Sequence, residues 1–294
     1  MIINFIRGLF MALADSVPGV SGGTIAFIMG FYDKFINSLD GLIYGNKKVK
    51  KESLIFLIKL GIGWVIGMIL ATLILASLFE RNIYEISSLF LGFIIFSIPL
   101  IIKEEKKELK GKYHNIIFTL VGIIIVIIIT KLNPVSSTES TVDITKLNIG
   151  LIIYIMIAGM LAISAMVLPG ISGSTLLLIF GLYISIITGV KELLHFNLSY
   201  LPSLIVFGIG VIIGILLIIK LIKKALQNYR SATIYLVIGL MLGSIYAIIM
   251  GPTTLKIPRD PMSINTFNIL FFIIGAGVIF GLDKIKLLLS KGND

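Results

Sequence analysis

The sequence PGVSGGT at residues 18–24 returns 151 positions later as PGISGST at residues 169–175. An apolar run, a glycine and a tyrosine follow each copy, so that 8 of the 15 positions are identical between residues 18–32 and 169–183. Two matched copies indicate an internal duplication of the chain. In a very apolar chain, a repeated Pro-Gly break is typical of transporters, because such breaks are tolerated at membrane depth only where they are buried or line a cavity.

The composition places the chain in a membrane. With 57% hydrophobic and 14% charged residues and a mean hydropathy of +1.07, it cannot form a water-soluble core with a polar shell. The absence of Cys and the presence of only two His argue against thiolate chemistry, a clustered zinc site and a cofactor. The net charge of +10 lies in short segments between apolar runs, so we expect it to set membrane topology and not to bind nucleic acid.

Six apolar runs are long enough to cross about 30 Å of hydrocarbon. They lie near 54–79, 84–102, 114–130, 201–222, 232–250 and 267–282. The two motif regions, 3–38 and 150–189, are each too long for one span and are interrupted by Pro-Gly. Each therefore predicts a broken or re-entrant helical hairpin.

The predicted fold is an all-α integral membrane protein of two inverted-topology repeats, each a broken or re-entrant hairpin followed by three transmembrane helices. Glycines outside the motif also repeat, since Gly63 and Gly67 match Gly210 and Gly214. The number of crossings in each half is odd, so the second half enters the membrane upside down. The predicted units are a first repeat, 1–132, an external linker, 133–148, and a second repeat, 149–294.

The distribution of basic residues tests this topology independently. With both termini and the loops 40–53, 103–113 and 220–231 inside, all but six of the 25 Lys and Arg lie on the inner side. The six on the outer side are Arg81, Lys131, Lys146, Lys191, Lys256 and Arg259. Charge and crossing number therefore agree on cytoplasmic N- and C-termini.

The repeated motif combines residues that bend the backbone with residues that begin helices. Proline fixes φ, glycine permits a tight reversal, and serine and threonine are preferred N-caps, so each motif predicts a bend that launches a helix. The free N–H groups and hydroxyls at such a start predict a site for a phosphate or carboxylate, and inverted halves would bring the two starts together near the midplane. The candidate phosphate-binding residues are Ser21, Gly22, Gly23, Thr24, Ser172, Gly173, Ser174 and Thr175.

Ionisable residues at membrane depth are also functional candidates. Asp15, three residues before Pro18, is the candidate for proton coupling, since a carboxyl there can exchange a proton or pair with Arg7. Its counterpart in the second half is Met166, so the halves are chemically unequal. Trp64 is interpreted as a packing or interfacial residue.

The same motifs also fit structural and enzymatic interpretations. Small residues allow close helix packing, and packing is the preferred interpretation of the Gly63/Gly67 and Gly210/Gly214 pairs. The Gly-x-Ser-Gly pattern also resembles the nucleophile of intramembrane serine proteases, which need a histidine on a neighbouring helix. His114 at the inner surface and His195 in an outer loop do not suit that role, and no constellation for a membrane enzyme such as a lipid phosphatase is found.

At these residues the chain resembles the bacterial polyprenyl-phosphate transporter family. The first family signature resembles Gly8, Met11, Ala14 and Asp15 followed by 18–24, and the second resembles 162–166 followed by 169–174. The resemblance covers essentially the whole chain. In many relatives we expect a bulkier residue at the position of Thr175, which weakens only the role of Thr175.

The resemblance implies a non-enzymatic flippase of the bacterial cytoplasmic membrane that returns undecaprenyl phosphate from the outer to the inner leaflet for cell-wall synthesis. Its expected partners are the polyprenyl phosphate lipid, the bilayer and protons, with Asp15 for coupling and Arg7 for the charge of the head group. The residues alone predict an anion-binding transporter of inverted repeats, but they do not identify the lipid as its substrate. An ion-coupled transporter of a small soluble anion therefore remains the alternative.

Overall fold

The computed structural model describes residues 2–15, 21–70, 82–132, 142–194, 196–254 and 258–291, which form helices and turns with no strand among them. Six helical segments are long and apolar enough to cross a membrane, which confirms the predicted all-α membrane fold. They are Lys47–Leu70, Ile83–Glu104, Tyr113–Leu132, Ile149–Val167, Leu198–Asn228 and Arg230–Thr253. Most of the predicted linker, 133–141, lies outside the described residues.

Each motif region forms three helices in the same order. A first helix leads to the motif, a short helix begins directly after the motif serine, and a third helix follows a sharp turn. These are α1 (Ile2–Asp15), α2 (Gly22–Ile28) and α3 (Tyr32–Tyr44), and α9 (Ile149–Val167), α10 (Gly173–Ile179) and α11 (Tyr183–Leu194). The turns contain Gly30 and Gly181 at φ of 65° and 62°, a conformation that favours glycine. In the second region, α10 and α11 meet at a bend of 110°.

The remaining helices follow the predicted spans with shifted ends, except for a short helix in the predicted loop 103–113. They are α4 (Lys47–Leu70), α6 (Ile83–Glu104), α7 (Lys106–Leu109), α8 (Ile116–Leu132), α12 (Leu201–Asn228), α13 (Arg230–Met250) and α14 (Ile269–Lys291). Residues 71–79 of the first predicted span lie outside the described residues. The α12 helix continues six residues past the predicted end at 222, because apolarity sets the length of a span whereas Lys and Gln are also good helix formers. The α9 helix is by itself long enough to span the membrane, although the sequence predicted it as part of a hairpin. The described apolar part of α14, Ile269–Gly281, is shorter than a full span.

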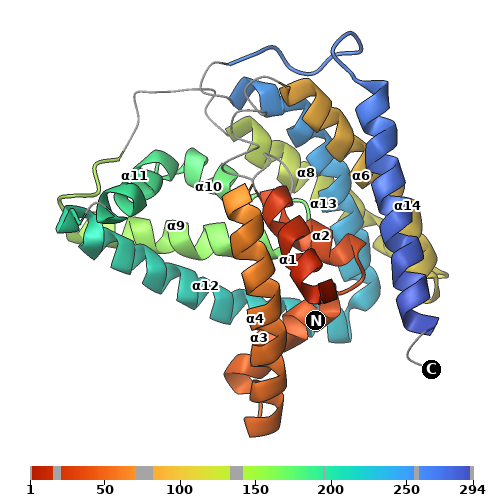
Figure 1. Cartoon of the computed structure of the whole chain (residues 1–294), viewed down its shortest axis with the longest axis horizontal. Coiled ribbons are helices and arrows are strands. Elements are labelled where there is room, and N and C mark those ends of the chain that lie inside the picture. Colours follow the sequence, from red (N-terminus) through yellow and green to blue (C-terminus); the bar gives the residue numbers. More distant parts are fainter. Residues whose placement is uncertain are drawn as a thin grey trace.

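The helices pack in matching pairs in the two halves. Within the halves, α1 lies beside α4, and α9 lies beside α12 (Figure 1). Between the halves, α8 of the first packs on α13 of the second, and α14 of the second packs on α6 of the first. The pairs within the halves and the pairs between the halves therefore each occur twice, with corresponding helices in the two copies.

Glycines make these pairs close. A Cβ at Gly63 would collide with the carbonyl of Phe5, and a Cβ at Gly210 would collide with the carbonyl of Met156. Gly63 and Gly210 match each other in the duplication, as do Phe5 and Met156. The packing interpretation of these glycines is thus confirmed. The recurrence supports the duplication, while the opposite orientation of the halves in the membrane stays a prediction.

The largest buried core is shared between the halves. Its fully buried side chains include Ile94 from the first half and Ile219, Ile234 and Met241 from the second. Ile25 of α2 belongs to the same cluster. The helix launched by the first motif therefore starts inside the protein, at the junction of the two halves.

Candidate functional site

The α2 helix begins with a complete N-cap. Ser21 is extended, at φ −130° and ψ 154°, and its buried hydroxyl accepts the N–H of Thr24 at 3.2 Å. The same hydroxyl donates to the carbonyl of Leu168 at 3.0 Å. The prediction that the motif launches a helix is confirmed here. Residues 16–20, which include Pro18 and Gly19, lie outside the described residues.

A carboxylate of the protein itself lies at this helix start. Asp15 Oδ1 accepts the N–H of Gly22 at 2.6 Å, and Oδ2 accepts the indole N–H of Trp64 at 2.9 Å. A Cβ on Gly22 would lie 2.8 Å from Asp15 Oδ2, so the glycine makes the approach possible. A negative charge is favoured at a helix N-terminus. The position predicted for a substrate anion in the first motif is therefore held by Asp15.

The two motifs meet in space. The hydroxyl of Thr24 accepts the N–H of Gly170 at 2.8 Å, and the hydroxyl of Tyr32 donates to the carbonyl of Val167 at 3.2 Å. Gly23 packs so closely that a Cβ there would collide with the same carbonyl of Val167. Thr24 is only 1% exposed, so these polar contacts are shielded from solvent. The start of α2 and the end of α9 thus form one junction between the halves.

The second motif is built differently. The α10 helix begins at Gly173, but the hydroxyl of Ser172 does not cap it and instead shares a 2.8 Å hydrogen bond with the hydroxyl of Ser174. Met166 packs against Gly173, where Asp15 packs against Gly22 in the first half. Ser174 and Thr175 are half-buried, whereas the corresponding residues Gly23 and Thr24 are buried. The second helix start therefore carries hydroxyls without a carboxylate and is the more accessible of the two.

Arg7 lies apart from this junction. It precedes Asp15 by eight residues on α1, which is about 12 Å along a helix. Its guanidinium donates to the side-chain carbonyl of Asn4 at 3.1 Å, and its Cζ lies 4.6 Å from the centre of the Phe31 ring. Among the described residues, Arg7 and Asp15 form no ion pair with each other. A role for Arg7 with the head group stays a prediction.

The hydrogen bond between Trp64 and Asp15 was not predicted from the sequence. Comparison of the halves contains the signal: Asp15 corresponds to Met166, and Trp64 corresponds to Val211. Both members of the hydrogen-bonded pair are thus polar in one half and apolar in the other. A single tryptophan among packing glycines did not by itself indicate this partner.

The described residues offer little to metal or protease chemistry. No group of three or more His, Asp and Glu in these ranges is placed to hold a metal ion. His114 is exposed in the 3₁₀ turn Tyr113–Asn115, away from both motif serines in sequence, and His195 lies outside the described residues. The second motif offers hydroxyls and helix N–H groups to an anion, and Asp15 at the first motif is a carboxyl group that can carry or release a proton.

Two known proteins are similar to this chain over most of its length. The chain is 36% identical over 256 residues to the polyprenyl-phosphate transporter of Staphylococcus aureus, covering 86% of this chain and 87% of that protein. It is 33% identical over 252 residues to the polyprenyl-phosphate transporter of Vibrio cholerae, covering 82% of this chain and 75% of that protein. No solved structure matches significantly.

The family comparison covers both motifs. A family described as undecaprenyl phosphate translocase-like matches residues 11–266. This family and both relatives are named for transport and not for an enzymatic reaction. The resemblance stated from the sequence is confirmed, and the chain belongs to the undecaprenyl phosphate translocase-like family.

Proposed function

We propose that this protein is a flippase that returns undecaprenyl phosphate from the outer to the inner leaflet of the bacterial cytoplasmic membrane, for reuse in cell-wall synthesis. The observation that carries the proposal is the junction of the two motifs, where Thr24 of one half binds Gly170 of the other. A binding site between two halves is reachable from either side when the halves rock against each other. The names of the relatives supply the substrate class.

The phosphate binds at the second motif in this proposal. Ser172 and Ser174 present hydroxyls that now bond only to each other in the described structure, and Thr175 follows in the same turn. A phosphate offers acceptor oxygens to these hydroxyls and to the first N–H groups of α10. The polyprenyl tail stays in the hydrocarbon between helices, since only the charged head group needs a polar path.

Asp15 couples transport to protons. While it is ionised, its charge at the junction repels the arriving phosphate, because like charges interact strongly away from bulk water. Proton uptake by Asp15 removes this repulsion and weakens its bond to Gly22. An inward proton gradient then favours binding from the outer side and release on the inner side. Arg7, farther along α1, offers a cation to the head group on its way.

The topology proposed with this mechanism is an inverted pair of repeats with both termini in the cytoplasm. The excess of Lys and Arg in the loops 40–53, 103–113 and 220–231 supports it. In the structure, the start of α1 and the end of α14 lie toward the same side of the molecule, the lower side of Figure 1.

The test is movement of labelled undecaprenyl phosphate between leaflets of liposomes that contain the purified protein, with and without a proton gradient. Replacing Ser172 and Ser174 by Ala removes the hydroxyls. Losing one hydrogen bond to a charged group costs about 1.5–3 kcal/mol, which is roughly 10- to 150-fold in affinity, so loss of both hydroxyls should weaken binding by about 100-fold or more.

The matched control is the Ser97→Ala, Ser244→Ala double variant. Both serines are buried and donate to carbonyls of their own helices, at 2.8 and 2.7 Å. This control should transport normally. Normal transport by the Ser172→Ala, Ser174→Ala variant would remove the proposed site, and uptake of inorganic phosphate without lipid movement would favour the small-anion transporter.

A further inference from the structure

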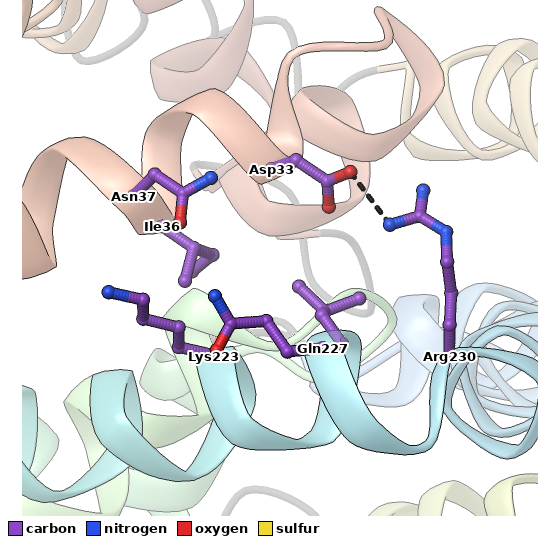
Figure 2. A pocket seen from close by; sticks show the side chains of 7 residues that line it. Asp33, Ile36, Asn37, Lys223, Gln227 and Arg230 are labelled. Atoms are coloured by element: carbon purple, nitrogen blue, oxygen red, sulfur yellow. Dashed lines mark hydrogen bonds and ion pairs between the residues drawn. The ribbon is translucent and has the colours of Figure 1, made fainter.

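A second interface between the halves is held by ion pairs. The carboxylate of Asp33 on α3 lies 3.0 Å from the guanidinium of Arg230 at the start of α13, and Asp40 on α3 pairs with Lys223 on α12 (Figure 2 shows the first pair). Glu105, between α6 and α7, accepts two further bonds from the same guanidinium, at 2.6 and 3.0 Å. Arg230, in the second half, therefore binds two carboxylates of the first half.

The pairs are arranged as a ladder. Asp33 and Asp40 are seven residues apart and so lie on one face of α3, and Lys223 and Arg230 have the same spacing in the opposite direction. Between the two pairs lies a pocket of about 90 Å³, across which Asn37 faces Gln227 (Figure 2). This interface carries ion pairs and a pocket beside the buried side chains of Ile36 and Leu226, unlike the glycine-packed pairs such as α1 with α4.

The duplication does not repeat this charge pattern. By the 151-residue offset of the motifs, Asp33 and Asp40 correspond to Ile184 and Lys191. By the 147-residue offset of the packing glycines, Lys223 and Arg230 correspond to Ala76 and Ile83. In the duplication, α3 and α12 correspond to α11 and α4. The residues at the matching positions cannot form these ion pairs.

We propose that the Asp33–Arg230–Glu105 and Asp40–Lys223 ion pairs are a latch that closes one side of the transporter and opens in each transport cycle. This inference rests on the alternating access of the proposed function. Because the loops 103–113 and 220–231 carry inner-side charge, the latch closes the cytoplasmic side. The structure is then the state that receives lipid from the outer leaflet, and opening the latch leads to the state that releases it inside.

The side chains of the latch suit repeated opening. The exposed fractions are 31% for Arg230, 47% for Asp33, 32% for Lys223 and 14% for Asp40, so water reaches each group when the pair separates. The single Asp40–Lys223 contact holds weakly and reforms readily, whereas Glu105, which is 16% exposed, binds Arg230 through two bonds and is the stronger part of the latch. A latch of this kind biases the populations of two states without locking either.

The experiment exploits the absence of native cysteine. The Asn37→Cys, Gln227→Cys variant places two thiols across the pocket and leaves every latch residue intact. We expect a reducible bis-methanethiosulfonate reagent to bridge them in liposomes and to stop lipid transport, and reduction to restore it. The control is Glu108→Cys, Lys112→Cys, an exposed pair within one segment whose cross-link should leave transport unchanged.

Charge changes in the cross-linking background test the latch without any transport measurement. Asp40→Asn should slow cross-linking by roughly 2- to 5-fold, as expected for loss of a partly exposed pair. The exchanged variant Asp40→Lys, Lys223→Asp should restore the rate. An unchanged cross-linking rate in both variants, or a cross-linked protein that still transports lipid, would overturn the latch. Charge-dependent cross-linking in a protein that moves no polyprenyl phosphate would instead support the latch and overturn the proposed function.

Discussion

Replacing Thr24 by valine tests the junction of the two motifs directly. Valine keeps the branched shape of threonine but removes the oxygen that accepts the N–H of Gly170 at 2.8 Å. The change also removes the 3.1 Å contact between the hydroxyls of Ser21 and Thr24, but Ser21 still accepts the N–H of residue 24 and donates to the carbonyl of Leu168. The N–H of Gly170 is then the buried donor that is left without its partner. Leaving such a donor unpaired costs about 1–3 kcal/mol.

The expected loss is measurable in purified protein. At roughly 2–4 °C for each kcal/mol in domains of about 150–250 residues, the unfolding midpoint should fall by about 2–12 °C. Hydrogen exchange measured by mass spectrometry should show faster exchange at Gly170 in Thr24→Val. Thr24→Ser is the control, since it keeps the acceptor and should keep the protection of Gly170 even where the lost methyl lowers stability. A Thr24→Val protein with the wild-type midpoint and unchanged protection at Gly170 would refute the junction.

Three further changes address the carboxylate and the packing. Asp15→Asn should leave lipid movement but abolish its response to an imposed proton gradient, and a retained response would remove Asp15 from coupling. Trp64→Phe removes one donor to Asp15 and should lower stability by about 1–3 kcal/mol, measured as a lower unfolding midpoint. If the stability lost in the Asp15→Asn, Trp64→Phe double variant equals the sum of the losses in the two single variants, the two side chains are not coupled. Gly63→Ala drives a Cβ into the carbonyl of Phe5 and should reduce the yield of folded protein, whereas Gly61→Ala, with open space around it, should not.

The sequence predicted the elements of the site better than their connections. Ser21 and Ser172 stand directly before helices, as the local preferences of Pro, Gly and Ser imply. The same preferences predict equal caps, yet only Ser21 caps its helix, because Ser172 bonds to Ser174 instead. Local propensity fixes where a helix can begin, but competition among nearby acceptors is decided by packing.

The contacts of Asp15 show the same limit at longer range. Membrane depth marked this residue as functional, and composition suggested Arg7 as its partner. Its observed partners are the N–H of Gly22 and the indole of Trp64, 49 residues away. A contact with Trp64 depends on the close pairing of α1 with α4, which the repeated glycines indicated without specifying which side chains would meet.

The two halves share a scaffold and differ in its polar groups. Glycine contacts recur at matching positions of the two halves. Asp15 and Trp64, however, correspond to Met166 and Val211 in the second half, and the residues of the latch have no charged counterparts that could form the same pairs. Equal scaffolds give two related conformations, and unequal polar groups give them unequal free energies. In the proposed function, that inequality sets which side is closed at rest and cannot drive net transport, since a fixed free-energy difference between two states cancels over a complete cycle. In the proposed function, the direction of lipid movement must therefore come from the lipid and proton gradients acting through Asp15.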